Sequence, residues 1–285
     1  MSRGIGAVAI SAAIATALSA GPVAAPAGGA GAAETNRPLV QVFSHPELPF
    51  TLAYRSLQPG EAILARLNDG AAVKKIELKL DDQVRALRPP GKKDAGSAAA
   101  LLGIDMGKKP QDIVIRVRTE RADGTTESRD LLLAVEAKEF PSTRLQVAPG
   151  MANPPKEVQE EIRRESELVA EVMSRVSPEW LVEGPFQSPL PDHEPFPNFG
   201  QRRVYNKTVS SIHSGVDISA PRGTPASATN GGRVVLASKL YLSGWTVIID
   251  HGRGVFTNLH TREQVARAWE VASEEGSGVI VETEE

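Results

Sequence analysis

Two segments of the chain alternate between apolar and charged residues with a period of two. Residues 76–81 read Ile-Glu-Leu-Lys-Leu-Asp, and residues 113–118 read Ile-Val-Ile-Arg-Val-Arg. Because successive side chains of a β-strand point to opposite faces, this pattern predicts strands with one buried face and one face in water. Asp123-Gly124 is a typical turn pair and predicts a hairpin between the second of these strands and the next. We therefore expect antiparallel β-sheet.

Residues 38–140 contain further short stretches of this kind, separated by turn residues. The candidate strands span residues 39–43, 50–54, 61–67, 76–80, 113–119 and 131–135, with a flexible loop expected at 88–97. About 100 residues of short strands joined by turns predict an immunoglobulin-like β-sandwich over residues 38–140. Nothing in this module indicates chemistry, so we expect it to act as a spacer or a binding module.

The first 33 residues have the layout of a secretory signal peptide. They carry one charged side chain, Arg3, followed by an Ala-rich apolar run and then by Gly, Pro and other small residues. A membrane anchor is the alternative, but Ala and Gly dominate the run, and Pro22 and Pro26 interrupt it. We therefore expect export to the periplasm, the cell envelope or the extracellular space, with no stable membrane anchor.

Charge and composition exclude several classes of protein. The 285 residues have a formal net charge of -3 and a pI near 6.0, so nothing in the charge favours binding to nucleic acid. The chain has no cysteine, which excludes a disulfide framework and a thiolate nucleophile. Any bound metal must then be held by histidine and carboxylate side chains.

Residues 154–177 predict a connecting helix. Apolar residues recur at helical spacing from Val158 to Val176, and Glu–Arg pairs at i,i+4 occupy the polar side. Pro154-Pro155 favours the start of a helix, and Pro178 favours its end. The helix either packs between two domains or binds a partner. The five prolines within residues 184–198 predict an extended entry into a second domain.

His213 and Asp217 are the residues most suggestive of chemistry. An imidazole nitrogen and a carboxylate oxygen are suitable zinc ligands. On a straight strand these two residues would stand about 13 Å apart, which is too far for one ion. Convergence therefore needs a bend, and Gly215 between them can provide one by adopting backbone angles closed to other residues. The spacing by itself is more often that of an exposed His and a turn-forming Asp.

Five blocks of residues around this pair follow one another between about 184 and 257. They are Asn198-Phe199-Gly200 with Arg202-Arg203, His213-Ser214-Gly215-Val216-Asp217-Ile218, Ala220-Pro221-Arg222-Gly223-Thr224-Pro225, Asn230-Gly231-Gly232-Arg233-Val234-Val235, and Thr246-Val247-Ile248-Ile249-Asp250-His251-Gly252. In type, order and spacing these blocks resemble the lysostaphin-type zinc metalloendopeptidases, the β-lytic peptidoglycan hydrolases.

The resemblance implies a mostly β chain, with an antiparallel β metallopeptidase-like domain over residues 184–285. It implies that His213 and Asp217 bind Zn²⁺ and that the peptides of peptidoglycan are the substrate. In this family the Asp-His-Gly block is a turn that leaves a strand, so His251 is expected to be structural. The family also carries a Tyr-x-His-Leu-like element whose His assists catalysis, and His260 is the provisional equivalent here.

The chain departs from the family pattern after about residue 257. His260 arrives one residue early, and a slip of one residue turns a strand side chain to the opposite face. No histidine follows His260, so the family's His-x-His motif with the third zinc ligand is missing and the zinc site is incomplete. Residues 262–272 look helical. Glu263 or Glu270 could complete the ligand set, but no spacing favours either.

Three hypotheses follow. The first is a secreted cell-wall zinc metalloendopeptidase-like protein, impaired in this chain because its catalytic domain is truncated or altered. The second is a non-catalytic relative that binds peptidoglycan or regulates a partner wall hydrolase. The third is a shifted reading frame near the C-terminus. Zinc stoichiometry would separate the first two, and translation of the other frames after the codon for Thr257 would test the third.

Overall fold

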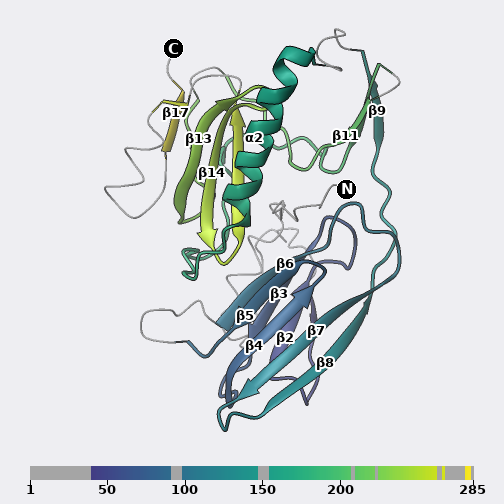
Figure 1. Ribbon diagram of the computed structural model, residues 1–285, viewed down its shortest axis with the longest axis vertical. Helices are drawn as coiled ribbons and strands as arrows, with labels where there is room; N and C mark the ends of the chain where they lie inside the picture. Colours follow the sequence, from purple (N-terminus) through teal and green to yellow (C-terminus); the bar gives the residue numbers. More distant parts are fainter. Residues whose placement is uncertain are drawn as a thin grey trace, which may run out of the picture.

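The computed structural model describes residues 40–90, 98–146, 154–206, 209–221, 224–261, 265–266 and 280–283, and all structural statements below refer to them. Within these ranges the chain is mostly β, with several antiparallel sheets and one helix, as predicted (Figure 1). The predicted signal peptide lies outside the described residues. In the described ranges, no helix is both long enough and apolar enough to span a bilayer.

Two four-stranded sheets form the N-terminal sandwich. The first has the order β1-β2-β3-β6 and the second β5-β4-β7-β8. The bounds are β1 Gln41–Phe43, β2 Phe50–Tyr54, β3 Ala62–Leu67, β4 Val73–Leu80, β5 Gln83–Leu87, β6 Ala99–Gly103, β7 Asp112–Arg121 and β8 Thr126–Ala134. A constant-type immunoglobulin domain has four and three strands, so the immunoglobulin-like assignment stays a prediction.

The alternating segments form the centre of the second sheet. In β7, Ile113, Ile115 and Val117 are buried in the sandwich core, whereas the residues between them are exposed. Burying one such side chain contributes about 1.5–3 kcal/mol. β7 continues into β8 through the predicted turn, where Gly124 has a φ of +86°. The sequence pattern therefore predicted this hairpin correctly.

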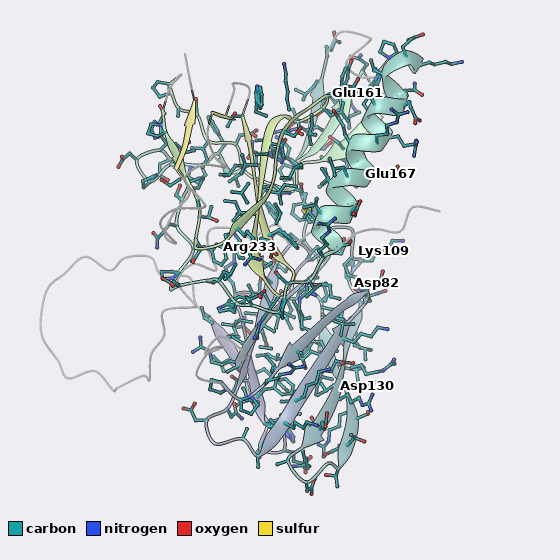
Figure 2. All side chains as sticks on the ribbon, turned by 60° about the vertical axis from the view of Figure 1, so that its left-hand side comes forward. Asp82, Lys109, Asp130, Glu161, Glu167 and Arg233 are labelled. Atoms are coloured by element: carbon teal, nitrogen blue, oxygen red, sulfur yellow. The ribbon has the colours of Figure 1, made fainter. Side chains whose placement is uncertain are left out.

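The predicted connecting helix is α2, Lys156–Ser174. Its apolar side, with Val169, Val172 and Met173, packs on Ile248 and Phe256 of the C-terminal sheet. Glu167 on its other side is exposed, and so is Glu161 nearer the N-terminal end of the helix (Figure 2). The helix therefore covers one face of a sheet in the C-terminal region.

That C-terminal sheet has the order β13-β14-β15, all antiparallel, with bounds Arg233–Leu240, Gly244–Gly252 and Val255–Thr261. Side chains of β14 alternate between its two faces. Ile248 faces α2, whereas Val247 and Ile249 pack with Leu259 and Ala226 on the opposite face. Each face of this sheet thus has its own apolar cluster.

Two smaller sheets complete the C-terminal region. One has the order β11-β10-β9, with β9 Ser142–Leu145, β10 Arg202–Tyr205 and β11 Val209–Ile212. The other has the order β12-β17-β16, with β12 Ala226–Ser227, β16 Val265–Ala266 and β17 Ile280–Thr283. Residues 265–266 therefore form a strand where the sequence suggested a helix over 262–272. The remainder of that segment lies outside the described residues.

The sandwich and the C-terminal region share an apolar interface. Leu64 and Leu101, on the outer face of the first sheet, pack with Val182, Phe186 and Val255. β3 consequently has buried residues on both faces, because one face meets the sandwich core and the other meets the C-terminal region. The same sheet thus supports both parts of the molecule.

Candidate functional site

The hairpin of β10 and β11 positions His213. Arg202 pairs with Ile212 at its open end, and the ladder continues one residue further. There the amide of Gly200 donates to the carbonyl of His213 over 2.7 Å, and the amide of His213 donates to the carbonyl of Gln201 over 2.9 Å. His213 is therefore held on both sides by backbone hydrogen bonds immediately after β11.

The chain bends after His213 and brings Asp217 back toward it. The amide of Phe196 donates to the carbonyl of Asp217 over 2.8 Å, and Pro195 forms an isolated bridge with Ile218. As a result, Nε2 of His213 lies 3.2 Å from Oδ1 of Asp217. The bend falls at Gly215, but this glycine does not adopt a positive φ, so the expectation of special backbone angles was wrong.

Asn198 holds both members of the pair. Its carbonyl lies 3.1 Å from Nδ1 of His213, and because a carbonyl only accepts, Nδ1 carries the proton in this hydrogen bond. Its side-chain Nδ2 donates to Oδ2 of Asp217 over 2.7 Å, and its Oδ1 accepts from the amide of Asp217 over 3.1 Å. Both side chains are thereby oriented with Nε2 and Oδ1 facing each other.

Arg203 places a positive charge directly beside the carboxylate. Its guanidinium donates to Oδ2 of Asp217 over 2.7 Å. Desolvation by burial would raise the pKa of Asp217, but the hydrogen bond from Arg203, the charge of His213 and the hydrogen bond from Asn198 together lower that pKa below its usual value. The carboxylate is therefore ionised at neutral pH, as a metal ligand must be.

The pair fits two positions of a zinc site. Two ligand atoms that each lie about 2.0–2.1 Å from a tetrahedral Zn²⁺ are about 3.3–3.4 Å apart, close to the 3.2 Å between Nε2 of His213 and Oδ1 of Asp217. The hydrogen bond from Nδ1 of His213 to a backbone carbonyl is the usual outer contact of a histidine ligand. Among the residues that the structure describes, however, no group of three or more His, Asp or Glu could hold a metal ion.

His260 lies on β15 and pairs in register with Thr246 of β14. Its Nδ1 is 3.0 Å from Oγ1 of Thr246, and desolvation by burial lowers the pKa of His260, although part of the residue remains exposed to solvent. Alternation along β15 places His260 on the same face as Phe256, the face that α2 covers. Within the described ranges the structure therefore does not join His260 to His213 and Asp217, and its catalytic role stays a prediction.

His251 is fully buried and lies edge-on to the ring of Phe186. Its Nδ1 donates to the carbonyl of Gly231 over 2.6 Å, which leaves Nε2 to accept from the hydroxyl of Thr257 over 2.8 Å. Burial lowers the pKa of His251, so the ring is neutral near pH 7. Both nitrogens are satisfied within the fold, as expected of a structural histidine.

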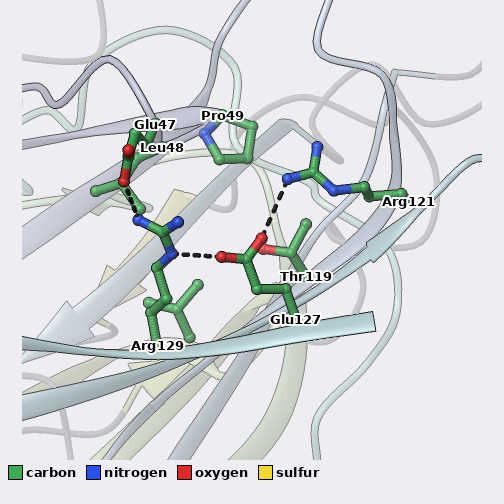
Figure 3. A pocket seen from close by; sticks show the side chains of 8 residues that line it. Glu47, Leu48, Pro49, Thr119, Arg121, Glu127 and Arg129 are labelled. Atoms are coloured by element: carbon green, nitrogen blue, oxygen red, sulfur yellow. Dashed lines mark hydrogen bonds and ion pairs between the residues drawn. The ribbon is translucent and has the colours of Figure 1, made fainter. Parts of the chain in front are cut away.

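A small surface hollow on the sandwich offers no competing site. Its charged lining is already paired: Arg129 contacts Glu47 and Glu127, and Arg121 donates to Glu127 over 3.1 Å (Figure 3). Because each arginine there faces a carboxylate, the hollow lacks an uncompensated charge with which to recognise a charged ligand. The His213 and Asp217 pair is therefore the better candidate.

Comparisons with known proteins match the region that contains this site to a peptidase family. Residues 211–279 match the model of peptidase family M23, and the match includes His213, Asp217 and His260. A solved structure of a protein assigned to peptidase M23 from Pseudomonas aeruginosa is 19% identical, with a TM-score of 0.51 over 80% of this chain and 82% of that one. No curated protein matches. The resemblance of the C-terminal region to the lysostaphin-type metallopeptidases is thus confirmed.

Sequence reasoning did not identify the roles of Asn198 and Arg203. Both stood in a block that resembled the family, but neither was assigned a contact with Asp217. They lie 19 and 14 residues before it, and only the pairing of β10 with β11 brings these positions together. Their place in that block was the signal available in the sequence.

Proposed function

We propose that the protein is an exported, zinc-binding metalloendopeptidase-like protein that acts on the peptides of peptidoglycan, with impaired hydrolysis in this chain. The observation that carries this proposal is the 3.2 Å approach of Nε2 of His213 to Oδ1 of Asp217. The family match over residues 211–279 supports peptidoglycan as the substrate class. The signal-like sequence of residues 1–33 supports export.

In this proposal His213 and Asp217 hold the ion, and the surrounding residues fix the orientation and the ionisation of these two ligands. Asn198 orients the imidazole and the carboxylate, while Arg203 keeps the second carboxylate oxygen occupied and the group ionised. Bound zinc would supply a water of lowered pKa and polarise a peptide carbonyl. With two protein ligands instead of three, the ion would be held weakly, which accounts for the proposed impairment.

The alternative is a non-catalytic relative that binds peptidoglycan or regulates a partner wall hydrolase. Two observations favour it: the described residues supply two metal donors, and His260 lies on the α2 face of its sheet. The domain boundaries at residues 38–140, 154–177 and 184–285 remain part of this proposal in both versions.

Zinc stoichiometry tests the proposal. We expect the purified protein to bind one Zn²⁺ per chain in equilibrium dialysis with metal analysis, and the His213→Ala variant to lose it. The control is Asp130→Asn, which removes an exposed carboxylate on the sandwich and should leave zinc binding unchanged. Release of soluble peptides from purified peptidoglycan then separates the two versions. Zinc binding without release would favour the non-catalytic relative, and absence of zinc binding would contradict the metal site.

A further inference from the structure

Phe199 follows Asn198, the residue that bonds both His213 and Asp217, and its ring packs on the N-terminal sandwich. A Cβ added to Gly60 would lie 2.7 Å from Cε1 of Phe199, so the ring rests directly on the backbone of this glycine. Phe140 meets the ring edge-on, with centroids 6.3 Å apart. Phe199 is thus inserted between the sandwich and the segment that leaves it.

An ion pair with the buried Glu61 holds a positive charge over the same ring. Nζ of Lys138 lies 5.7 Å from the ring centroid of Phe199 and 5.3 Å from that of Phe140, within the range of a cation–π contact. The ammonium also lies 3.1 Å from Oε1 of Glu61, whose side chain is 4% exposed and is paired with Arg55 as well. Glu61 therefore fixes Lys138 above both rings.

The backbone on the other side of Phe199 is tied to the segment that leaves the sandwich. A Cβ added to Gly200 would lie 1.9 Å from Cδ1 of Phe140, so that ring covers the glycine. The amide of Arg202 donates to the carbonyl of Pro141 over 2.8 Å, and β10 then runs parallel to β9. The position of residues 199–205 is therefore tied to that of residues 138–145.

We propose that Lys138 and Phe199 are positioning residues, through which the N-terminal sandwich sets the orientation of His213 and Asp217. The sandwich fixes Phe199, Phe199 fixes Asn198, and Asn198 bonds both members of the pair. This gives the sandwich a role beyond that of a spacer. The effect on metal binding rests on the proposed function, whereas the effect on the imidazole does not.

The test compares Lys138→Met and Phe199→Leu with two matched controls in the full chain. Lys79→Met removes an exposed lysine from β4, and Phe43→Leu removes a partly buried aromatic ring from β1. Neither side chain belongs to the Lys138–Glu61 ion pair or to the ring contacts of Phe140 and Phe199. The main readout is the separation of Nε2 of His213 and Oδ1 of Asp217 in crystal structures of the metal-free variants.

We expect this separation to stay near 3.2 Å in the wild type and in both controls, and to exceed about 4 Å, the limit of an ion pair, in Lys138→Met and Phe199→Leu. If the wild type binds zinc, both variants should weaken the affinity by about tenfold, the lower end of the effect of losing an outer contact to a ligand. An unchanged separation in folded variants would overturn the positioning role. Absence of zinc binding in the wild type would refute the proposed function and leave the structural test in force.

Discussion

Replacing Gly252 with alanine should destabilise the C-terminal region strongly. Gly252 has a φ of +92°, and its added Cβ would lie 1.9 Å from the carbonyl oxygen of Glu179. A carbon–oxygen contact needs about 3.3 Å, so the two backbones must separate by about 1.4 Å. That movement would strain the hydrogen bonds on either side, from Leu181 to His251 over 2.9 Å and from Arg253 to Ser177 over 2.8 Å.

A matched control separates this steric effect from the cost of a positive φ. Gly184 has a φ of +68°, but an added Cβ would meet no atom within 4 Å. We expect Gly184→Ala to lower the free energy of unfolding by about 1–2 kcal/mol, the cost of the left-handed conformation alone. Gly252→Ala should cost about 2–6 kcal/mol more, because it adds overpacking of about 1–3 kcal/mol and weakens two hydrogen bonds of about 0.5–1.5 kcal/mol each.

Urea unfolding followed by tryptophan fluorescence measures this difference where it arises. The three tryptophans of the chain, Trp180, Trp245 and Trp269, all lie in its C-terminal half. Trp180 also packs on the cluster shared with the sandwich, so the signal reports on the C-terminal half and on that interface. Losses that agree within about 0.5 kcal/mol for the two variants would refute the close approach of the 177–181 segment to β14.

Three further predictions concern the site and its surroundings. Asn198→Ala should weaken zinc affinity by about 10–100-fold in competition with a chromophoric chelator, because it removes both side-chain hydrogen bonds that orient Asp217. An unchanged affinity would contradict the orienting role of Asn198. His260→Ala should leave zinc affinity within about twofold of the wild-type value, since the residue lies with Thr246 on the face of the sheet that α2 covers. A large loss of affinity would identify His260 as a ligand. The urea midpoint should fall as pH drops below about 6.5. Burial lowers the pKa of His251 in the folded protein, so on acidification the unfolded chain binds a proton before the folded chain does, and unfolding is favoured. A midpoint that is flat or rises on acidification would contradict this.

The sequence predicted strands best where one face meets water. β4 and β7 alternate cleanly because their outer faces are solvated. The turn at Asp123-Gly124 indicated the connection from β7 to β8. β5 and β6 were missed for opposite reasons. β5 buries Arg85, whose guanidinium donates to the carbonyls of Leu101 and Gly254, so a charged residue stands at an inward position. β6 reads Ala-Ala-Leu-Leu-Gly and shows no alternation, because both its faces are covered.

The candidate site was predicted in its ligands but not in its support. The residue types of His213 and Asp217 suit a donor pair, and the family blocks around them implied the metal. The contacts of Asn198 and Lys138 join segments that are far apart in the chain. Lys138 and His213 are 75 residues apart, and they are linked by a cation–π contact to Phe199 and by the hydrogen bond from His213 to Asn198. No local pattern encodes such contacts, since they arise only when β9, β10 and β11 assemble.

Crystals grown with Zn²⁺ and measured at the zinc absorption edge give the most direct test of the metal site. The account predicts one anomalous peak about 2.0–2.1 Å from both Nε2 of His213 and Oδ1 of Asp217, with Asn198 retaining its hydrogen bonds to the pair. A peak elsewhere, or the two side chains turned away from each other with no ion between them, would contradict it.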